Sequence, residues 1–361
     1  NQPGALEIGI GPSHRHALEL HPLPHEIQKT THVDLKTTDV VIVSGGAKGV
    51  TAATAAALAQ NVPAQLVLIG RSPSPGKEPS WLKPLSEPAE IKRAILENEF
   101  NNNGASPKDI ENSYQKHMAN REILHTLNSL RGLGATAQYV SMDIRDSKKI
   151  EGLFNDIRSK LGPIRAVIHG AGVIDDRLIV DKTLDQFNRV YDTKVKGLKS
   201  LLKATKNDHL RYLVIFSSVA ARFGNIGQVD YAMANEALNK IARQESLNRT
   251  ACHVASINWG PWDGGMVSPS LKREFLKNHV ELIPMETGAG CMLDEMLDDR
   301  QHPVEIVVGS GPLYKNDSEK AVAHPLIQES ILDKDPLSLL FKREIDTTGY
   351  PILDAHKLDG K

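Results

Sequence analysis

Short apolar runs alternate with stretches that favour helix through the middle of the chain. The first run, Val40-Val41-Ile42-Val43, is continuous, as is typical of a strand buried on both faces of a sheet. The Ala-rich stretch 52–59 that follows it strongly favours helix. Further apolar runs lie at 65–69, 137–142, 166–168, 212–216, 253–258 and 304–308. This alternation predicts βαβ units, so we expect an α/β fold with a Rossmann-like, doubly wound parallel sheet.

The rhythm is interrupted once and changes at both ends. Residues 73–120 are too many for an ordinary loop between strand and helix, and their charged, helical character predicts an insertion after the second strand. The His- and Pro-rich residues 1–38 are expected to be a linker or a partial upstream segment. Their His residues have no Cys or carboxylate at ligand spacing, which argues against a metal site. Residues 316–361 are too few to hold their own core, so the main domain is predicted at 39–315.

Charge and cysteine content narrow the function classes. Lys and Arg number 43 against 44 Asp and Glu, and the net charge of −1 argues against a broad nucleic-acid or anionic-membrane surface. No apolar run approaches the roughly 20 residues of a membrane span. The two cysteines, Cys252 and Cys291, cannot form a framework of several disulfides, which favours a reducing, cytoplasmic compartment.

A glycine-rich turn follows the first strand and opens the first helix. Glycines let the main chain turn tightly and approach a pyrophosphate, whose charge then lies at the helix N-terminus. The residues expected to bind a dinucleotide there are Gly45, Gly46, Ala47, Lys48, Gly49 and Val50. A tight turn without a ligand is the alternative.

The ends of the next two strands bear on the choice of cofactor. The second strand ends in Arg71 and Ser72 without an acid, and a guanidinium there would clamp a 2′-phosphate, which favours NADPH over NADH. A solvated surface arginine is the alternative. At the end of the third strand, Asp143, followed by Ile144, is positioned either to accept a hydrogen bond from the adenine amino group or to cap a helix.

The fourth and fifth strands end in residues suited to carbonyl reduction. The small residues of His169-Gly170-Ala171-Gly172 would let a cofactor ribose lie on the main chain. Ser218 ends the fifth strand, and Tyr231 and Asn235 share one face of the next helix. The pKa of a free phenol is about 10, so Tyr231 needs a nearby ammonium to act as an acid. Lys194 is the candidate, with a surface lysine beside Lys196 and Lys199 as the alternative.

At these separations Lys194, Ser218, Tyr231 and Asn235 resemble the ketoreductase domains of modular polyketide and related fatty acid synthases, within the short-chain dehydrogenase/reductase superfamily. That family exchanges the lysine and asparagine positions of ordinary short-chain reductases. The sequence Trp259-Gly260-Pro261-Trp262 is also similar to this family. The glycine-rich turn departs from the pattern of the short-chain reductases at one position, because Thr51 stands where their last glycine is found. The resemblance covers roughly 39–312. The glycine-rich turn and the E-P-S-W-L sequence of the insertion resemble polyunsaturated fatty acid synthases more than macrolide synthases.

The resemblance implies NADPH-dependent reduction of a 3-oxoacyl thioester on the phosphopantetheine of an acyl carrier protein. Tyr231 would donate the proton, Ser218 would bind the same oxygen, and Lys194 would bind the nicotinamide ribose and lower the tyrosine pKa. Asn235 would hold water in a proton relay. Pro261 and Trp262 would contact the cofactor, and the stretch 267–285 would cover the acyl chain.

One further motif resembles this family, and one feature departs from it. Ile174-Asp175-Asp176 resembles the motif of ketoreductases that give the D-hydroxyl, and Phe223 replaces the tryptophan of the opposite group. Residues 1–38 are too few to form the bracing half-domain of many modular members, so the brace is expected to be either missing or supplied by another domain.

The tail resembles the opening of a hot-dog dehydratase domain, in L-x-x-H at 353–356 followed by Gly360. The resemblance implies that 316–361 are a linker and the leading edge of a dehydratase. The catalytic acid of the second hot-dog half is absent from this segment. The alternative is a plain loop. Two other functions stay open. The first is a catalytically silent scaffold domain of a megasynthase. The second is a free-standing dehydrogenase that acts on a sugar or steroid, and the absence of a lysine one turn after Tyr231 argues against this second function.

Overall fold

The computed structural model describes residues 33–309, except 63, 102–103, 266, 268, 278–279 and 298–302, together with short pieces nearer both ends. The chain divides into a unit of residues 26–313 and a second unit formed by residues 1–25 and 314–361. In the second unit β1 (Ile8–Ile10) pairs antiparallel with β2 (Arg15–Ala17), and β10 (Glu329–Leu332) with β11 (Leu339–Lys342). The dehydratase-like motif at 353–360 and most of the predicted linker 1–38 lie outside the described residues.

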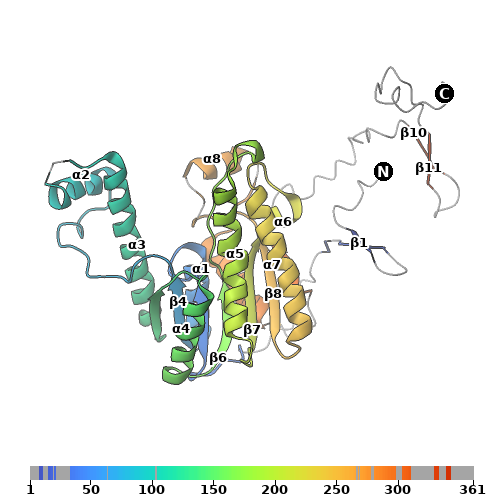
Figure 1. Ribbon diagram of the computed structural model, residues 1–361, viewed down its shortest axis with the longest axis horizontal. Helices are drawn as coiled ribbons and strands as arrows, with labels where there is room; N and C mark the ends of the chain where they lie inside the picture. Colours follow the sequence, from blue (N-terminus) through green and yellow to red (C-terminus); the bar gives the residue numbers. More distant parts are fainter. Residues whose placement is uncertain are drawn as a thin grey trace, which may run out of the picture. The chain divides into compact units, whose positions relative to one another are not determined.

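Seven parallel strands form the central sheet, in the order β5-β4-β3-β6-β7-β8-β9 (Figure 1). All seven predicted strands are confirmed, and the fold is the expected Rossmann-like α/β fold. Their bounds are β3 Val40–Ser44, β4 Gln65–Gly70, β5 Ala137–Ser141, β6 Ile164–His169, β7 Tyr212–Ser218, β8 His253–Trp259 and β9 Glu305–Val308.

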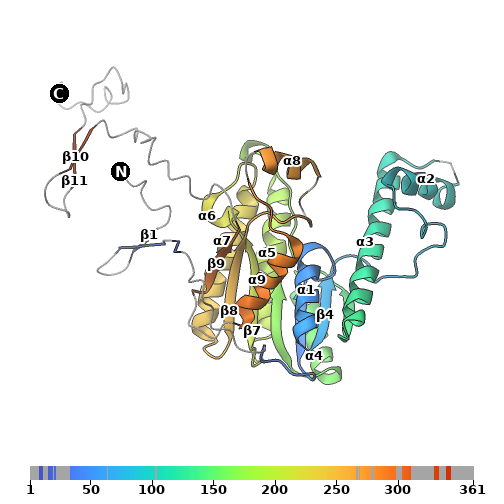
Figure 2. The same ribbon diagram turned by 180° about the vertical axis from the view of Figure 1, so that it is seen from behind.

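Helices cover both faces of this sheet (Figures 1 and 2). The side chains of Val41 and Val43 pack in the core under α1 (Gly49–Asn61), α3 (Pro107–Gly132) and α9 (Met285–Leu297). Val40 and Ile42 pack in the opposite core, under α4 (Ser147–Lys160), α5 (Leu184–Ala204) and α7 (Val229–Asn248). A strand buried on both faces therefore explains the continuous apolar run. None of the helices in the described part of the chain is long and apolar enough to cross a membrane.

The order of strands reverses between β3 and β6. The connection after β3 runs through α1 on one face of the sheet, and the connection after β6 runs through α5 on the other face. Gly170 donates its main-chain N–H to the carbonyl oxygen of Ser44 at 3.0 Å, so the carboxyl ends of the two strands are joined. In doubly wound sheets, ligands bind in the crevice outside the carboxyl ends at such a reversal. The fold therefore places the candidate site above β3 and β6.

The segment 73–120 is a helical insertion, as expected, but its second helix does not end with it. α2 (Pro88–Glu99) packs on the first half of α3 around a separate small core of Leu82, Ile91 and Ile95. Figure 2 shows α2 against the end of α3 that lies away from the sheet. The second half of α3 buries Ile123 in the main core. One helix thus serves both the insertion and the crossover between β4 and β5.

The structure also moves the start of the main domain. Val33 and Leu35, assigned to the linker from sequence, are buried in the main core. The main-chain N–H of Asp34 donates to the Tyr212 hydroxyl at 3.0 Å. The last residues of the predicted linker are therefore part of the sheet domain.

Candidate active site

A cavity of about 710 Å³ opens at the carboxyl ends of the strands. Its walls come from the turn between β3 and α1, the ends of β4, β6, β7 and β8, and the segment around α8 (Pro269–Lys277). Predicted site residues that line it are Gly45, Ala47, Lys48, Val50, Arg71, Ser72, Ile144, Gly170, Ala171, Gly172, Lys194, Ser218, Tyr231, Pro261 and Trp262. Predicted residues outside this lining are Gly46, Gly49, Asp143, His169 and Asn235.

The turn between β3 and α1 depends on glycine at two positions. Gly45 and Gly49 have φ angles of 76° and 55°, a region that side chains other than glycine rarely adopt. A Cβ atom on Gly45 would also lie 2.9 Å from the main chain of Ala171. Glycine therefore lets this turn approach the end of β6 and leaves the main chain exposed to the cavity.

The insertion helix holds the same turn from the other side. The Glu122 carboxylate, which lines the cavity, accepts a hydrogen bond from the Gly49 N–H at 3.0 Å. One turn later, the buried Thr126 hydroxyl donates to the Ala47 carbonyl oxygen at 3.0 Å. Burial lowers the pKa of Lys48, and the Glu122 charge opposes that shift. Sequence reasoning missed Glu122 and Thr126, because nothing local indicates that α3 reaches this turn.

At the end of β4 the exposed Arg71 faces the cavity, and its positive charge helps to lower the pKa of Asp143. The main cause of that lowered pKa is Arg145, whose Nη2 lies 2.6 Å from Asp143 Oδ2. Asp143 does not cap α4, because Asp146 accepts from the Lys149 N–H instead. The helix-cap alternative for Asp143 is therefore wrong, and its carboxylate already has a partner.

His169 points into the core rather than the cavity. Its ring is 1% exposed, with Nδ1 2.7 Å from the Ser44 hydroxyl and Nε2 2.9 Å from the Lys194 carbonyl oxygen. Burial, and then the Lys194 charge, lower the His169 pKa to about 3, so the ring is neutral. A neutral ring that donates from Nε2 and accepts at Nδ1 satisfies both contacts. His169 therefore ties β3 to the main chain of α5 at Lys194.

Lys194 and Tyr231 come together from different helices, as the sequence predicted. The Lys194 side chain is buried, its Nζ donates to the Phe216 carbonyl oxygen at 2.9 Å, and it lies 5.3 Å from the centre of the Tyr231 ring. Burial lowers the pKa of Lys194 to about 7. Among the described residues no carboxylate forms an ion pair with it. The amine therefore faces the phenol with little to stabilise its charge.

Ser218 and Asn235 complete the surroundings of the Tyr231 hydroxyl. Burial raises the Tyr231 pKa, while hydrogen bonds with the Asn235 and Ser218 side chains act in the opposite direction. Asn235 is fully buried and its Nδ2 donates to the Tyr231 carbonyl oxygen at 2.8 Å. Its Oδ1 has no hydrogen-bond partner within the described structure. A buried acceptor of this kind needs a donor such as a water molecule.

Apolar side chains line the part of the cavity near α8. The described residues of the stretch 267–285 that reach it are Val267, Leu271, Phe275 and Val280. Trp262 packs edge-on against Trp259 with ring centroids 4.8 Å apart. A Cβ atom on Gly288 would lie 2.4 Å from the Trp262 ring, so glycine in α9 leaves the space that seats this indole.

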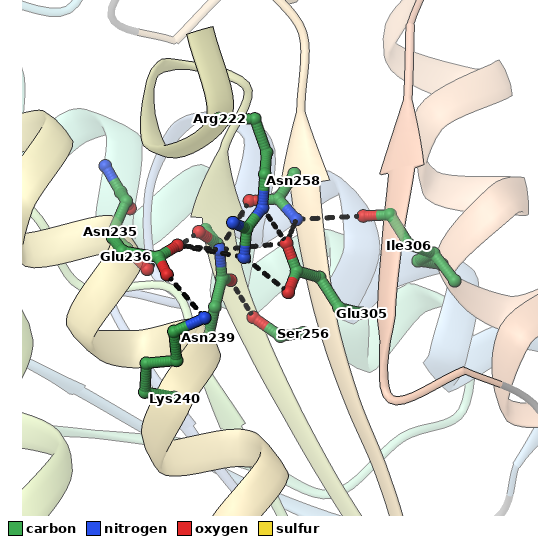
Figure 3. A network of polar contacts seen from close by, with 10 residues as sticks. Arg222, Asn235, Glu236, Asn239, Lys240, Ser256, Asn258, Glu305 and Ile306 are labelled. Carbon is green, nitrogen blue, oxygen red and sulfur yellow. Dashed lines mark hydrogen bonds and ion pairs between the residues drawn. The ribbon is translucent and has the colours of Figure 1, made fainter. Parts of the chain in front are cut away.

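A polar network fixes the helix that carries Tyr231 (Figure 3). Arg222, in the short helix α6 (Ala220–Phe223) after Ser218, pairs with Glu236 of α7 at 2.9 Å and with Glu305 of β9 at 2.6 Å. Asn239 joins α7 to Asn258 of β8 at 3.0 Å. The network thus connects α6 and α7 to the last two strands. It escaped sequence reasoning because its members are far apart in the chain.

Comparisons with known proteins show the family to which the chain belongs. The KR domain family model matches residues 39–264. The chain is 33% identical to one component of the polyunsaturated fatty acid synthase of Thraustochytrium sp., over 98% of this chain and 12% of that protein. It is 35% identical to polyketide synthase PksN of Bacillus subtilis, over 45% of this chain and 3% of that protein. The chain therefore spans a small fraction of these curated relatives.

Solved structures show the same fold. An N-terminal ketoreductase from the macrolactin assembly line superposes with a TM-score of 0.58 at 26% identity, covering 82% of this chain and 47% of that one. A ketoreductase domain from the bacillaene assembly line gives a TM-score of 0.63 at 24% identity, covering 86% of this chain and 64% of that one. The second likeness concerns the fold alone.

Proposed function

Because the chain belongs to the KR domain family of ketoreductases, we propose that it uses NADPH to reduce a 3-oxoacyl thioester on an acyl carrier protein to the 3-hydroxyacyl thioester. The observation that carries the proposal is the buried Lys194 amine facing the Tyr231 ring at 5.3 Å. An ammonium beside a phenol favours the phenolate, and so makes the phenol a better proton donor.

The residues around the cavity fit a dinucleotide. Residues of the glycine turn line the cavity, and the N-terminus of α1 that begins there favours a pyrophosphate. Lys48 and Arg71 bring positive charge to the adenosine end, where a 2′-phosphate distinguishes NADPH from NADH. The bound cofactor supplies the hydride, and the protein supplies position and electrostatics.

Each polar residue of the site has a role in this proposal. Tyr231 donates its hydroxyl proton to the oxygen of the reduced carbonyl, and Ser218 holds the same oxygen by a hydrogen bond. Lys194 binds the ribose hydroxyls next to the nicotinamide and lowers the Tyr231 pKa against the effect of burial. The unsatisfied Asn235 Oδ1 holds a water that returns a proton to Tyr231.

The apolar side chains of Val267, Leu271, Phe275 and Val280 suit the acyl chain of a fatty acid or polyketide intermediate, and we assign the cover of that chain to the stretch 267–285. Ile174 lines the cavity, and we assign the D-hydroxyl product to the motif Ile174-Asp175-Asp176. The proposed partners are the acyl carrier protein and neighbouring synthase domains, including a dehydratase that begins within 316–361. Neither Cys252 nor Cys291 is in a disulfide, which supports a cytoplasmic synthase.

The test follows NADPH absorbance in the presence of a 3-oxoacyl N-acetylcysteamine thioester, a small mimic of the carrier-bound substrate. The wild-type protein is expected to oxidise NADPH, and Tyr231→Phe to bind NADPH with unchanged affinity but to lose reduction. Wild-type protein that binds NADPH and never oxidises it would support the silent scaffold instead. Turnover retained by Tyr231→Phe would remove the tyrosine from its assigned role.

A further inference from the structure

A buried ion pair joins the start of α7 to the segment that precedes α5. Lys182 Nζ lies 2.6 Å from Asp230 Oδ2, and the two side chains are 3% and 1% exposed. Taking two charges out of water costs several kcal/mol per ion, and apolar side chains of similar size often stabilise such a site as well or better. The pair therefore needs an explanation beyond fold stability.

The remaining hydrogen bonds of this pair reach two walls of the cavity. The Lys182 ammonium also donates to the Asp175 carbonyl oxygen at 2.7 Å. The second oxygen of the Asp230 carboxylate accepts from the main-chain N–H of Tyr231 at 2.9 Å. One buried contact thus links the main chain of the loop after β6 to the main chain of the proposed proton donor.

The loop held in this way reaches the cavity through Gly172 and Ile174. Two other contacts join it to the start of α7. The Arg177 N–H donates to the Gly227 carbonyl oxygen at 2.9 Å, and the Gln228 side chain donates to Asp176 at 2.9 Å. Asp176 and Arg177 are exposed, so water competes for those contacts, whereas the Lys182–Asp230 pair is shielded from it.

We propose that Lys182 and Asp230 are positioning residues that fix the loop 172–176 relative to Tyr231, and thereby the face of the ketone presented for reduction. The inference rests on the proposed reductase function. Neither residue lines the cavity, so neither touches the reacting atoms. Their effect is expected on substrate orientation and on KM for the thioester, with the dinucleotide end of the cavity unaffected.

The experiment compares Lys182→Met, the double variant Lys182→Met/Asp230→Asn, and Lys160→Met as control. Lys160 pairs with Asp156 on the surface, with side chains 71% and 66% exposed. The double variant removes both charges and keeps an amide oxygen for the Tyr231 N–H, so it is expected to fold where the single variant leaves an unpaired buried carboxylate. Folding is checked by circular dichroism.

For each folded variant we would measure the ratio of the two 3-hydroxy enantiomers formed from the N-acetylcysteamine thioester, kcat, KM, and the Kd of NADPH. Loss of the pair is expected to lower the enantiomer ratio about tenfold, a barrier difference of about 1.4 kcal/mol. The NADPH Kd should stay within about twofold of wild type, and Lys160→Met should change nothing. A folded double variant with the wild-type ratio and KM overturns the proposal.

Hydrogen exchange separates this result from failure of the reductase assignment. Peptides covering 172–178 and the Tyr231 amide should exchange faster in the double variant and not in Lys160→Met. Unchanged exchange overturns the positioning role whatever the activity. If the wild-type protein reduces nothing, the proposed function fails, while faster exchange would still show that the pair holds the loop.

Discussion

The charge of Lys194 should make cofactor use depend on pH near neutrality. The amine is buried, donates to one carbonyl oxygen at 2.9 Å, and has no carboxylate partner in the described part of the chain. Burial lowers its pKa from the ordinary 10.5 to about 7. That displacement corresponds to about 5 kcal/mol against the charged amine, which is comparable with the whole stability of many domains.

Above about pH 7, the cofactor-free protein loses the ammonium to which we assign ribose binding and the tuning of Tyr231. The value of kcat/KM for NADPH reports groups of the free enzyme. It should therefore fall with rising pH through about 7, by about tenfold for each pH unit until the neutral-lysine enzyme sets a plateau. Bound NADPH is anionic and favours the ammonium, so kcat should fall only at higher pH.

The assay is initial-rate kinetics at constant ionic strength from about pH 6 to 9, with the thioester saturating. Lys194→Met should give a flat profile at the level of the wild-type plateau. Lys199→Met, an exposed lysine of the same helix, is the matched control and should keep the wild-type inflection. A wild-type profile that is flat through neutrality, or the same inflection in Lys194→Met, would refute the reasoning.

Three further changes test other parts of the site and fold. Arg71→Ala should raise the Kd of NADPH by about tenfold or more and leave that of NADH nearly unchanged in fluorescence titrations, and equal losses would place the 2′-phosphate elsewhere. Glu122→Ala should weaken binding of both dinucleotides by several-fold, whereas Glu122→Gln keeps an acceptor for the Gly49 N–H and should bind normally; identical behaviour of the two variants would contradict this role. Phe154→Ala removes a buried side chain of α4 from the core, and it should lower the free energy of unfolding by about 3–5 kcal/mol in urea titrations while the folded fraction binds NADPH normally.

The inner strands β3, β4, β6 and β7 were predictable because they are buried on both faces and leave apolar runs. The edge strands β5 and β9 are only partly buried. The bounds differ from the prediction by a residue or two, as where β6 begins at Ile164 rather than Ala166. The end of the insertion was harder to predict from the sequence. The sequence of α3 has no single apolar face, because its first half packs on the small core around Leu82 and its second half on the sheet.

The site was predictable where one element carries the spacing. Tyr231 and Asn235 lie one turn apart on α7, so their neighbourhood follows from helix geometry. The orientation of the His169 side chain could not be predicted in this way. Its ring lies in the core because it forms hydrogen bonds with Ser44 and with the Lys194 carbonyl oxygen, both of which are distant in sequence. Glu122 and the Lys182–Asp230 pair depend in the same way on contacts between segments that no local pattern relates.

The cost of the buried Lys194 charge bears on whether the domain is a catalyst or a scaffold. The unfolded chain keeps the lysine protonated to about pH 10.4, whereas the folded chain releases that proton at about pH 7. The unfolded state therefore binds more protons between these values, and the stability of the cofactor-free protein rises with pH across that window. Lys194→Met removes the penalty, which is largest below pH 7, so it should raise the free energy of unfolding there. A scaffold would be more stable with that apolar side chain, whereas a reductase needs the amine for an anionic ligand and a phenol. A protein destabilised by Lys194→Met at low pH would contradict this argument.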